Sequence, residues 1–325
     1  MAVADLRPMN LGELLDRTFG LYRSHFVLFV GIMALPQLFA VAINLFVQGL
    51  TGPQLMFPSA DASAAQPAIN FAAIMGGMAV MGLVYWVVYA IALGATTFAV
   101  SEVFLGRHAS IRGSYDRMKG RFWRLMDVVF SASLRVFGVF LLCILVIGAV
   151  IAATVAATAG AGSALSRIGV AVGILAGYIV GIWLAIRFAL RYSVSIPAAL
   201  MEDLKARVAM KRSSELMKGN IGRAFLMILL FLMVTYSAIF LIQGPFLVAT
   251  FLMGVDGVPP MWITSLSTVM GGVAGALVAP LMMIALVLLY YDVRMRREAF
   301  DLNYMLGALD GKAQPPPASP PPAVT

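Results

Sequence analysis

The chain has 325 residues, of which 61% are hydrophobic and only 12% are charged. Soluble domains are about 45–50% apolar and about a quarter charged, so this composition excludes an ordinary water-soluble fold. The 23 basic and 15 acidic residues give a net charge of +8, and the single cysteine, Cys143, excludes an intramolecular disulfide. Because the bases are spread between apolar stretches, the surplus charge indicates membrane topology, and we expect no nucleic-acid partner.

Six apolar stretches are long enough to cross a bilayer, whose hydrocarbon core of about 30 Å requires roughly 20 helical residues. In chain order they are Phe26–Leu50, Phe71–Val100, Val136–Ala159, Ile168–Leu190, Ala224–Met253 and Met261–Tyr291. The charged residues before the first stretch, among them Asp5 and Arg7, do not resemble a secretory signal peptide. The sequence therefore predicts an all-α integral membrane fold with six transmembrane helices.

Lysine and arginine resist translocation, so their positions predict the orientation of the spans. All of the 23 bases except Arg135 and Arg167 lie before the first span, near the loops after the second and fourth spans, or after the last span. We therefore expect a multi-pass protein of the bacterial cytoplasmic (inner or plasma) membrane, with both termini in the cytoplasm.

A faint internal repeat has a period of about one hundred residues. The segment Asp16–Gly20 recurs as Asp116–Gly120 and as Glu215–Gly219, and the acids Glu102, Glu202 and Asp301 recur at the same interval. The expected membrane domain, residues 1–306, then consists of three repeats at about 8–105, 106–205 and 206–306. Residues 307–325 are expected to form a disordered, proline-rich cytoplasmic tail. True duplication and coincidence both remain open.

Each repeat is interpreted as an amphipathic helix followed by a two-helix hairpin. The first amphipathic helix should follow an Asn10–Glu13 cap, the second should begin near Ile111, and the third should cover Asp203–Lys218. Such helices commonly lie in the headgroup plane, with their bases toward anionic lipid. The glycine that closes each recurring segment is expected to turn the chain into the bilayer, because glycine tolerates left-handed backbone angles.

Small residues at fourfold spacing predict close helix packing, since lipid supplies no hydrophobic force between helices. One such stripe, on the fourth span, is Gly169, Gly173, Gly177 and Gly181. Another, on the third span, is Gly148, Ala152, Ala156 and Gly160, and the sixth span carries Gly271, Gly275 and Ala279. The first two stripes should face one another in a hairpin, and a homodimer face is the alternative.

Polar residues inside hydrocarbon raise a functional hypothesis by default. The uncharged candidates are Asn44, Gln48 and Gln243, the last of which precedes the helix-breaking pair Gly244-Pro245. Arg135 either pairs with Asp127 or marks the true start of the third span. Cys143 in mid-span is expected to be inert, and the histidines His25 and His108 have no acid at ligand spacing. No catalytic motif is present, so we expect no enzyme activity, no cofactor and no metal.

Several segments carry a resemblance to a known family. They are Leu11–Thr18, Ser195–Ala198 followed by Glu202-Asp203, Arg212-Ser213 and Leu216–Asn220, and Leu289–Asp301, the last of which includes Asp292, Arg294, Arg297, Glu298 and Asp301. Together they resemble a bacterial membrane family of unknown function, labelled the glycerophosphoryl diester phosphodiesterase membrane domain. In the enzymes behind that label, the membrane region is fused to a catalytic, metal-dependent TIM barrel. No room for such a barrel is expected after the last matching segment, so the resemblance implies a membrane module alone.

Two functional hypotheses remain. The first is a non-enzymatic membrane module that scaffolds a membrane process, because the most patterned polar residues lie outside the mid-membrane region. Its expected partners are a bilayer with anionic headgroups and either another membrane protein or further copies of the chain. The second is a transporter or export component for a small solute or lipid, suggested by Gly244-Pro245 and the amides Asn44, Gln48 and Gln243.

Overall fold

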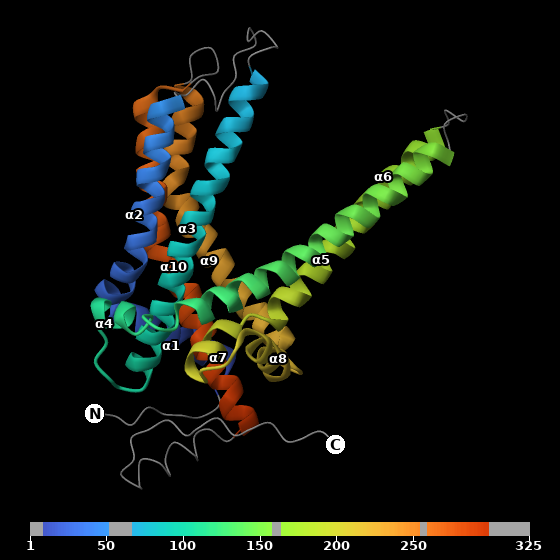
Figure 1. Ribbon diagram of the computed structural model, residues 1–325. Helices are drawn as coiled ribbons and strands as arrows, with labels where there is room; N and C mark the ends of the chain where they lie inside the picture. The colour runs from blue at the N-terminus through green and yellow to red at the C-terminus, as the bar shows by residue number, and fades with distance from the viewer. Residues whose placement is uncertain (1–8, 52–66, 158–163, 254–258, 299–325) are drawn as a thin grey trace. The chain divides into compact units, whose positions relative to one another are not determined.

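The structure, a computed structural model, describes residues 9–51, 67–157, 164–253 and 259–298. Within these ranges the chain forms ten helices and no strand (Figure 1). They are α1 (Leu11–Ser24), α2 (Phe26–Thr51), α3 (Pro67–Phe104), α4 (Ile111–Asp116), α5 (Phe122–Ala157), α6 (Ala164–Arg191), α7 (Ser195–Met201), α8 (Ala206–Met217), α9 (Ile221–Leu252) and α10 (Met261–Glu298).

Six of these helices are long and apolar enough to cross a membrane, which confirms the expected all-α multi-pass fold. They are α2, α3, α5, α6, α9 and α10. One expected boundary is wrong, because α5 begins at Phe122 and not at Val136. Asp127 and Arg135 therefore both lie inside α5, and Arg135 does not mark its start. Instead, the Arg135 guanidinium lies over the ring of Tyr192, 5.7 Å from the ring centroid.

The chain divides into two compact units, and each is described by itself. The first comprises the described residues of Met1–Trp123 and Leu226–Gln314, and the second those of Arg124–Phe225. The proposed repeats do not coincide with these units. The tail at 307–325 and the acid Asp301 lie outside the described residues.

In the first unit, α10 is the central helix. It packs against α1, α2 and α3, and 61% of its most apolar window is buried, more than in any other span of the described chain (Figure 1). Helix α1 begins with the expected cap, in which the Glu13 carboxylate accepts a 2.9 Å hydrogen bond from the Asn10 backbone N–H. Its Leu14 and Thr18 are buried, so α1 is held by its apolar face.

In the second unit, α5 and α6 lie side by side, with Gly177 and Gly181 of α6 against α5 (Figure 1). Helices α7 and α8 pack against each other. Helix α7, which the sequence analysis did not anticipate, buries most of its seven residues. A small apolar core joins Val128 of α5 and Ala199 of α7 to Ala206 and Ala209 of α8. Val208 of α8 is half exposed.

The expected glycine turns occur at two of the three positions. Gly120 and Gly219 have φ of +83° and +80°, the left-handed region that glycine tolerates, and each ends the turn before a long helix. The expectation for Gly20 is wrong, because this residue lies inside α1. Between α1 and α2 the chain turns instead at His25, with φ −126° and ψ 37°.

Candidate functional site

Gln48 of α2 lies against α10 in the first unit. The Gln48 side chain donates a 2.7 Å hydrogen bond to Thr268 Oγ1, and Ser265 Oγ donates to Gln48 Oε1 at 3.4 Å. Thr268 Oγ1 in turn donates to the Thr264 carbonyl at 2.9 Å. Both ends of the Gln48 amide are therefore bound by neighbouring helix α10, as expected for a polar group that contributes to helix association in lipid.

Gln37 extends this polar face, and the sequence analysis missed it. Its side chain lies against Gly275 of α10, where an added Cβ would come within 2.9 Å of the amide oxygen. It also shares a side-chain hydrogen bond with Tyr85 of α3. The signal was present in the sequence, because Gln37, Asn44 and Gln48 are spaced as neighbours on one helical face.

Asn44 faces a different environment from Gln48. Its side chain donates to the Ala40 carbonyl of its own helix at 2.9 Å, and it is exposed. Asn44 and Tyr85 line an open hollow of about 370 Å³ between α2 and α3. The remainder of the lining is apolar or glycine, from Ala40, Ile43, Val47, Met81 and Gly82.

Gln243 lies against α10, as Gln37 does. An added Cβ at Gly271 would come within 3.2 Å of Gln243 Nε2. Gly244 and Pro245 follow within α9, which runs as one helix from Ile221 to Leu252. The pair therefore does not break the span.

Small residues bring helices together in both units. In the first, an added Cβ at Gly272 would come within 2.2 Å of Val41 Cγ2, so α2 and α10 approach closely there. In the second, Gly177 and Gly181 of α6 lie against Ile147 and Cys143 of α5. At Gly148, Gly169 and Gly173 an added Cβ would meet no atom within 4 Å, so these glycines make no close helix contact. Ala152 and Ala156 both belong to α5, and Ala152 is exposed.

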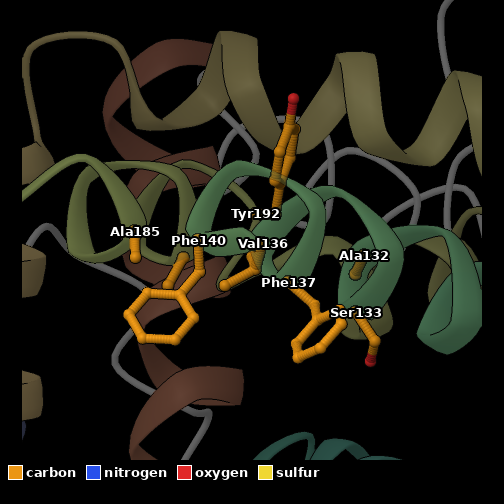
Figure 2. Close-up of a pocket in the computed structure, with 8 residues that line it drawn as sticks. Ala132, Ser133, Val136, Phe137, Phe140, Ala185 and Tyr192 are labelled. Atoms are coloured by element: carbon orange, nitrogen blue, oxygen red, sulfur yellow. The ribbon is translucent and has the colours of Figure 1, made fainter. Parts of the chain in front are cut away.

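The α5–α6 hairpin carries an open apolar groove of about 470 Å³ (Figure 2). Figure 2 shows the rings of Phe137 and Phe140 on one side of α5, with the Tyr192 side chain pointing the other way. Apart from Ser133 and Tyr192, the lining is aliphatic or aromatic hydrocarbon. This groove fits contact with lipid and carries no chemistry.

The C-terminal part of α10 contains the motif that suggested the family. Asp292 is fully buried; its carboxylate accepts hydrogen bonds from the Met9 N–H at 2.7 Å and from Arg296 Nε at 3.1 Å. Arg296 also donates to the Met9 carbonyl at 2.6 Å. These contacts hold the residue before the α1 cap against α10.

The neighbouring residues of the motif are also engaged. Arg294 donates to Glu298 Oε2 and to the Tyr290 hydroxyl, both at 3.1 Å. The Tyr291 hydroxyl lies 2.6 Å from Ser101 Oγ of α3. Arg297 is exposed and also has an interaction partner. The arrangement is a structural junction between α1, α3 and α10.

Two acids near the ends of apolar stretches bind bases on the next amphipathic helix. Glu102 Oε1, 8% exposed, lies 2.5 Å from Arg117 Nη2 in the first unit. In the second unit, Glu202, 4% exposed, lies 3.1 Å from Arg212 Nε. In each unit, a buried carboxylate thus ties the end of one helix to the amphipathic segment that follows it.

Two tyrosines bind backbone carbonyls of proline-containing helices. Tyr115 of α4 donates a 2.7 Å hydrogen bond to the carbonyl of Ile32, four residues before Pro36. Because proline has no N–H, it leaves that carbonyl without its helical donor. Burial raises the pKa of Tyr115 to about 12, so its hydroxyl stays protonated and able to donate. Tyr22 of α1 donates to the Leu277 carbonyl of α10, a helix that contains Pro280.

No group of three or more histidine, cysteine or acidic residues able to hold a metal occurs in the described part of the chain. Comparison of the chain with protein-family models, with curated proteins and with solved structures finds no match. The candidate site therefore stands on geometry alone, as a set of polar contacts between helices and a junction at the end of α10.

Proposed function

We propose that this chain is a non-enzymatic module of the bacterial inner membrane, with both termini in the cytoplasm, that scaffolds a membrane process. The six apolar helices make it a multi-pass membrane protein. We further propose that it belongs with the membrane family labelled the glycerophosphoryl diester phosphodiesterase membrane domain, on the strength of its α10 motif.

The burial of that motif is the observation that carries the proposal. Tyr290, Tyr291, Asp292 and Arg294 are all at most 9% exposed, and their polar atoms bind α1, α3 or α10 itself. Residues used in this way support a rigid platform, because their donors and acceptors are already occupied. A catalytic site would instead need reactive groups aimed into an accessible cleft.

The test is recovery of partners from native membranes. The full chain would be cross-linked in cells, purified, and compared with an unrelated multi-pass protein expressed at the same level. A scaffold should yield the same associated proteins in repeated experiments, and these should be lost when Asp292→Ala disturbs the junction. Recovery of no reproducible partner, or of the same proteins with the unrelated control, would contradict the proposal.

A second candidate, transport of a small solute or lipid, is favoured by the hollow at Asn44 and Tyr85. Its test first removes the single native cysteine by Cys143→Ala. Asn44→Cys is introduced into this background, and intact cells are treated with a membrane-impermeant maleimide. A transport path requires labelling at Asn44→Cys, together with protection by the transported compound. Absence of labelling, with normal labelling of a cysteine placed in an outer loop, would exclude a water-accessible path there.

A further inference from the structure

A second hollow, of about 590 Å³, lies entirely within the second unit, between α5 and the start of α8. Its charged lining consists of Asp127, Arg135, Lys205 and Arg207. Phe130 and Leu134, both more than half exposed, supply an apolar wall. Three bases thus meet one acid beside exposed hydrocarbon, a combination that neither the scaffold proposal nor the α10 junction uses.

Arg135 is the residue that points to a ligand. It lies in the apolar helix α5, and its Nη1 is buried without a hydrogen-bond partner among the described residues. The guanidinium carbon lies over the ring of Tyr192, 5.7 Å from the ring centroid, and this cation–π contact leaves Nη1 without a hydrogen bond. A charged side chain held in a membrane helix with an unused donor commonly marks a site for a charged ligand.

The start of α8 adds further donors to the same hollow. Helix α8 has twelve residues, and Lys205 at its N-cap makes no side-chain capping bond. The first-turn N–H groups of a helix have no internal acceptor, and they lie at the positive end of the helix dipole. An anion therefore finds backbone donors from α8 and side-chain donors from α5 in one place.

Nearby charges do not cancel this positive potential. Asp203 is already paired with Arg124, which lies one turn before Asp127 on α5. Asp127 is then the acid that lines the hollow itself.

We propose that this hollow binds a phosphate-ester group, supplied in the first instance by an anionic phospholipid whose acyl chains follow Phe130 and Leu134. Basic pockets at the ends of transmembrane helices recognise such headgroups through the same combination of cations and apolar wall. The proposal does not depend on the scaffold role, because it concerns a different compact unit and a different set of residues.

The experiment measures lipid binding to the full chain in a neutral detergent by native mass spectrometry. Phosphatidylglycerol is the anionic probe, and phosphatidylcholine is the zwitterionic control. The double variant Lys205→Gln/Arg207→Gln should weaken phosphatidylglycerol binding by about fivefold for each base removed. Lys211→Gln is the matched control, since Lys211 is an exposed base on the same helix that lies outside the hollow.

Two further variants guard against misfolding. Asp127→Asn removes the repelling carboxylate and should tighten phosphatidylglycerol binding several-fold, an effect that a damaged fold would not produce. Arg135→Gln should weaken binding, whereas Arg135→Lys should retain part of it, because the charge remains while the planar fork is lost.

Competition identifies the source of the phosphate. If inorganic phosphate and glycerol 3-phosphate fail to displace phosphatidylglycerol, the ligand is the lipid. If these soluble compounds bind with the same dependence on Lys205, Arg207 and Asp127, the site still takes a phosphate group, but from solution. The proposal is overturned if both lipids bind alike and neither the double variant nor Asp127→Asn changes the affinity for any of the probes.

Discussion

The contact between Tyr115 and Ile32 gives the sharpest test of how the amphipathic segments are held to the membrane helices. The change is Tyr115→Phe, which removes the hydroxyl and leaves the ring. The Ile32 carbonyl has no helical donor, because residue 36 is proline and lacks an N–H. The Tyr115 hydroxyl takes the place of that donor, so Tyr115→Phe leaves the carbonyl without a hydrogen bond. Ile32 is fully buried, so water cannot readily take over.

An unsatisfied buried acceptor costs about 1–3 kcal/mol, whereas side-chain hydrogen bonds in membrane proteins average about 0.6 and reach about 1.7 kcal/mol. We therefore expect Tyr115→Phe to lower the free energy of unfolding by about 1–2 kcal/mol. The effect should have a specific origin, namely the orphaned Ile32 carbonyl. Pro36→Ala restores an N–H that can bond that carbonyl, so Tyr115→Phe should cost only a few tenths of a kcal/mol in the Pro36→Ala background.

The assay is a double-mutant cycle by titration with sodium dodecyl sulfate in mixed micelles, followed by tryptophan fluorescence. A coupling energy near 1 kcal/mol between positions 36 and 115 is the expected result. Equal costs of Tyr115→Phe in the two backgrounds, within about 0.3 kcal/mol, would refute the reasoning, because the hydroxyl would then not be serving the proline-freed carbonyl.

The same contact has a defined pH dependence. The folded state raises the pKa of Tyr115 from 10.0 to about 12, so the folded protein holds this proton more tightly than the unfolded chain does. The stabilisation is therefore fully present below pH 10 and is lost as the pH rises through 12. The stability difference between the native chain and Tyr115→Phe should stay constant up to pH 10 and shrink above it.

Two other changes test the packing of α10 by the same unfolding assay. Gly272→Ala places a Cβ within 2.2 Å of Val41 Cγ2, so it should lower the free energy of unfolding by about 1–3 kcal/mol. Gly222→Ala is the control, because its added Cβ meets no atom within 4 Å. Equal effects of the two variants would contradict the close approach of α2 and α10. Asp292→Ala removes the acceptor shared by Met9 and Arg296 and should cost about 1.5–3 kcal/mol. Asp292→Asn keeps one acceptor oxygen and should cost less, whereas no loss in either variant would remove the junction's structural role.

The six spans could be predicted because hydropathy is a property of local composition, and the six candidate spans confirm it. The start of the third span could not, because a single arginine in an apolar stretch suggests a boundary, although Phe122–Ala149 contains Arg135 and still reaches a mean hydropathy of 2.4. The helix continues through this residue because Tyr192, distant in the sequence, covers its guanidinium. Gly20 fails for a related reason: beyond the glycine, the Tyr22 hydroxyl of α1 donates to the Leu277 carbonyl of α10, a contact from a distant part of the sequence.

The candidate site was only partly accessible from the sequence. Gln37 shares a helical face with Asn44 and Gln48, so periodicity alone could have found it. The contact of Tyr115 with Ile32 joins residues 83 positions apart, and that of Met9 with Asp292 joins residues 283 apart. No local pattern encodes such pairings, because they depend on how the helices assemble.

The few charges of this chain fall into two groups with different consequences. Glu102, which is 8% exposed, binds the half-exposed Arg117, so Glu102→Gln should lower the free energy of unfolding by about 0.5–1 kcal/mol without changing phosphatidylglycerol binding. Asp127 is exposed beside the hollow of the second unit, so Asp127→Asn should leave stability nearly unchanged while binding tightens. Measuring both quantities on both variants separates the two roles. If each variant altered stability and binding together, the charges would form one network, and the division between structural pairs and a ligand site would be wrong.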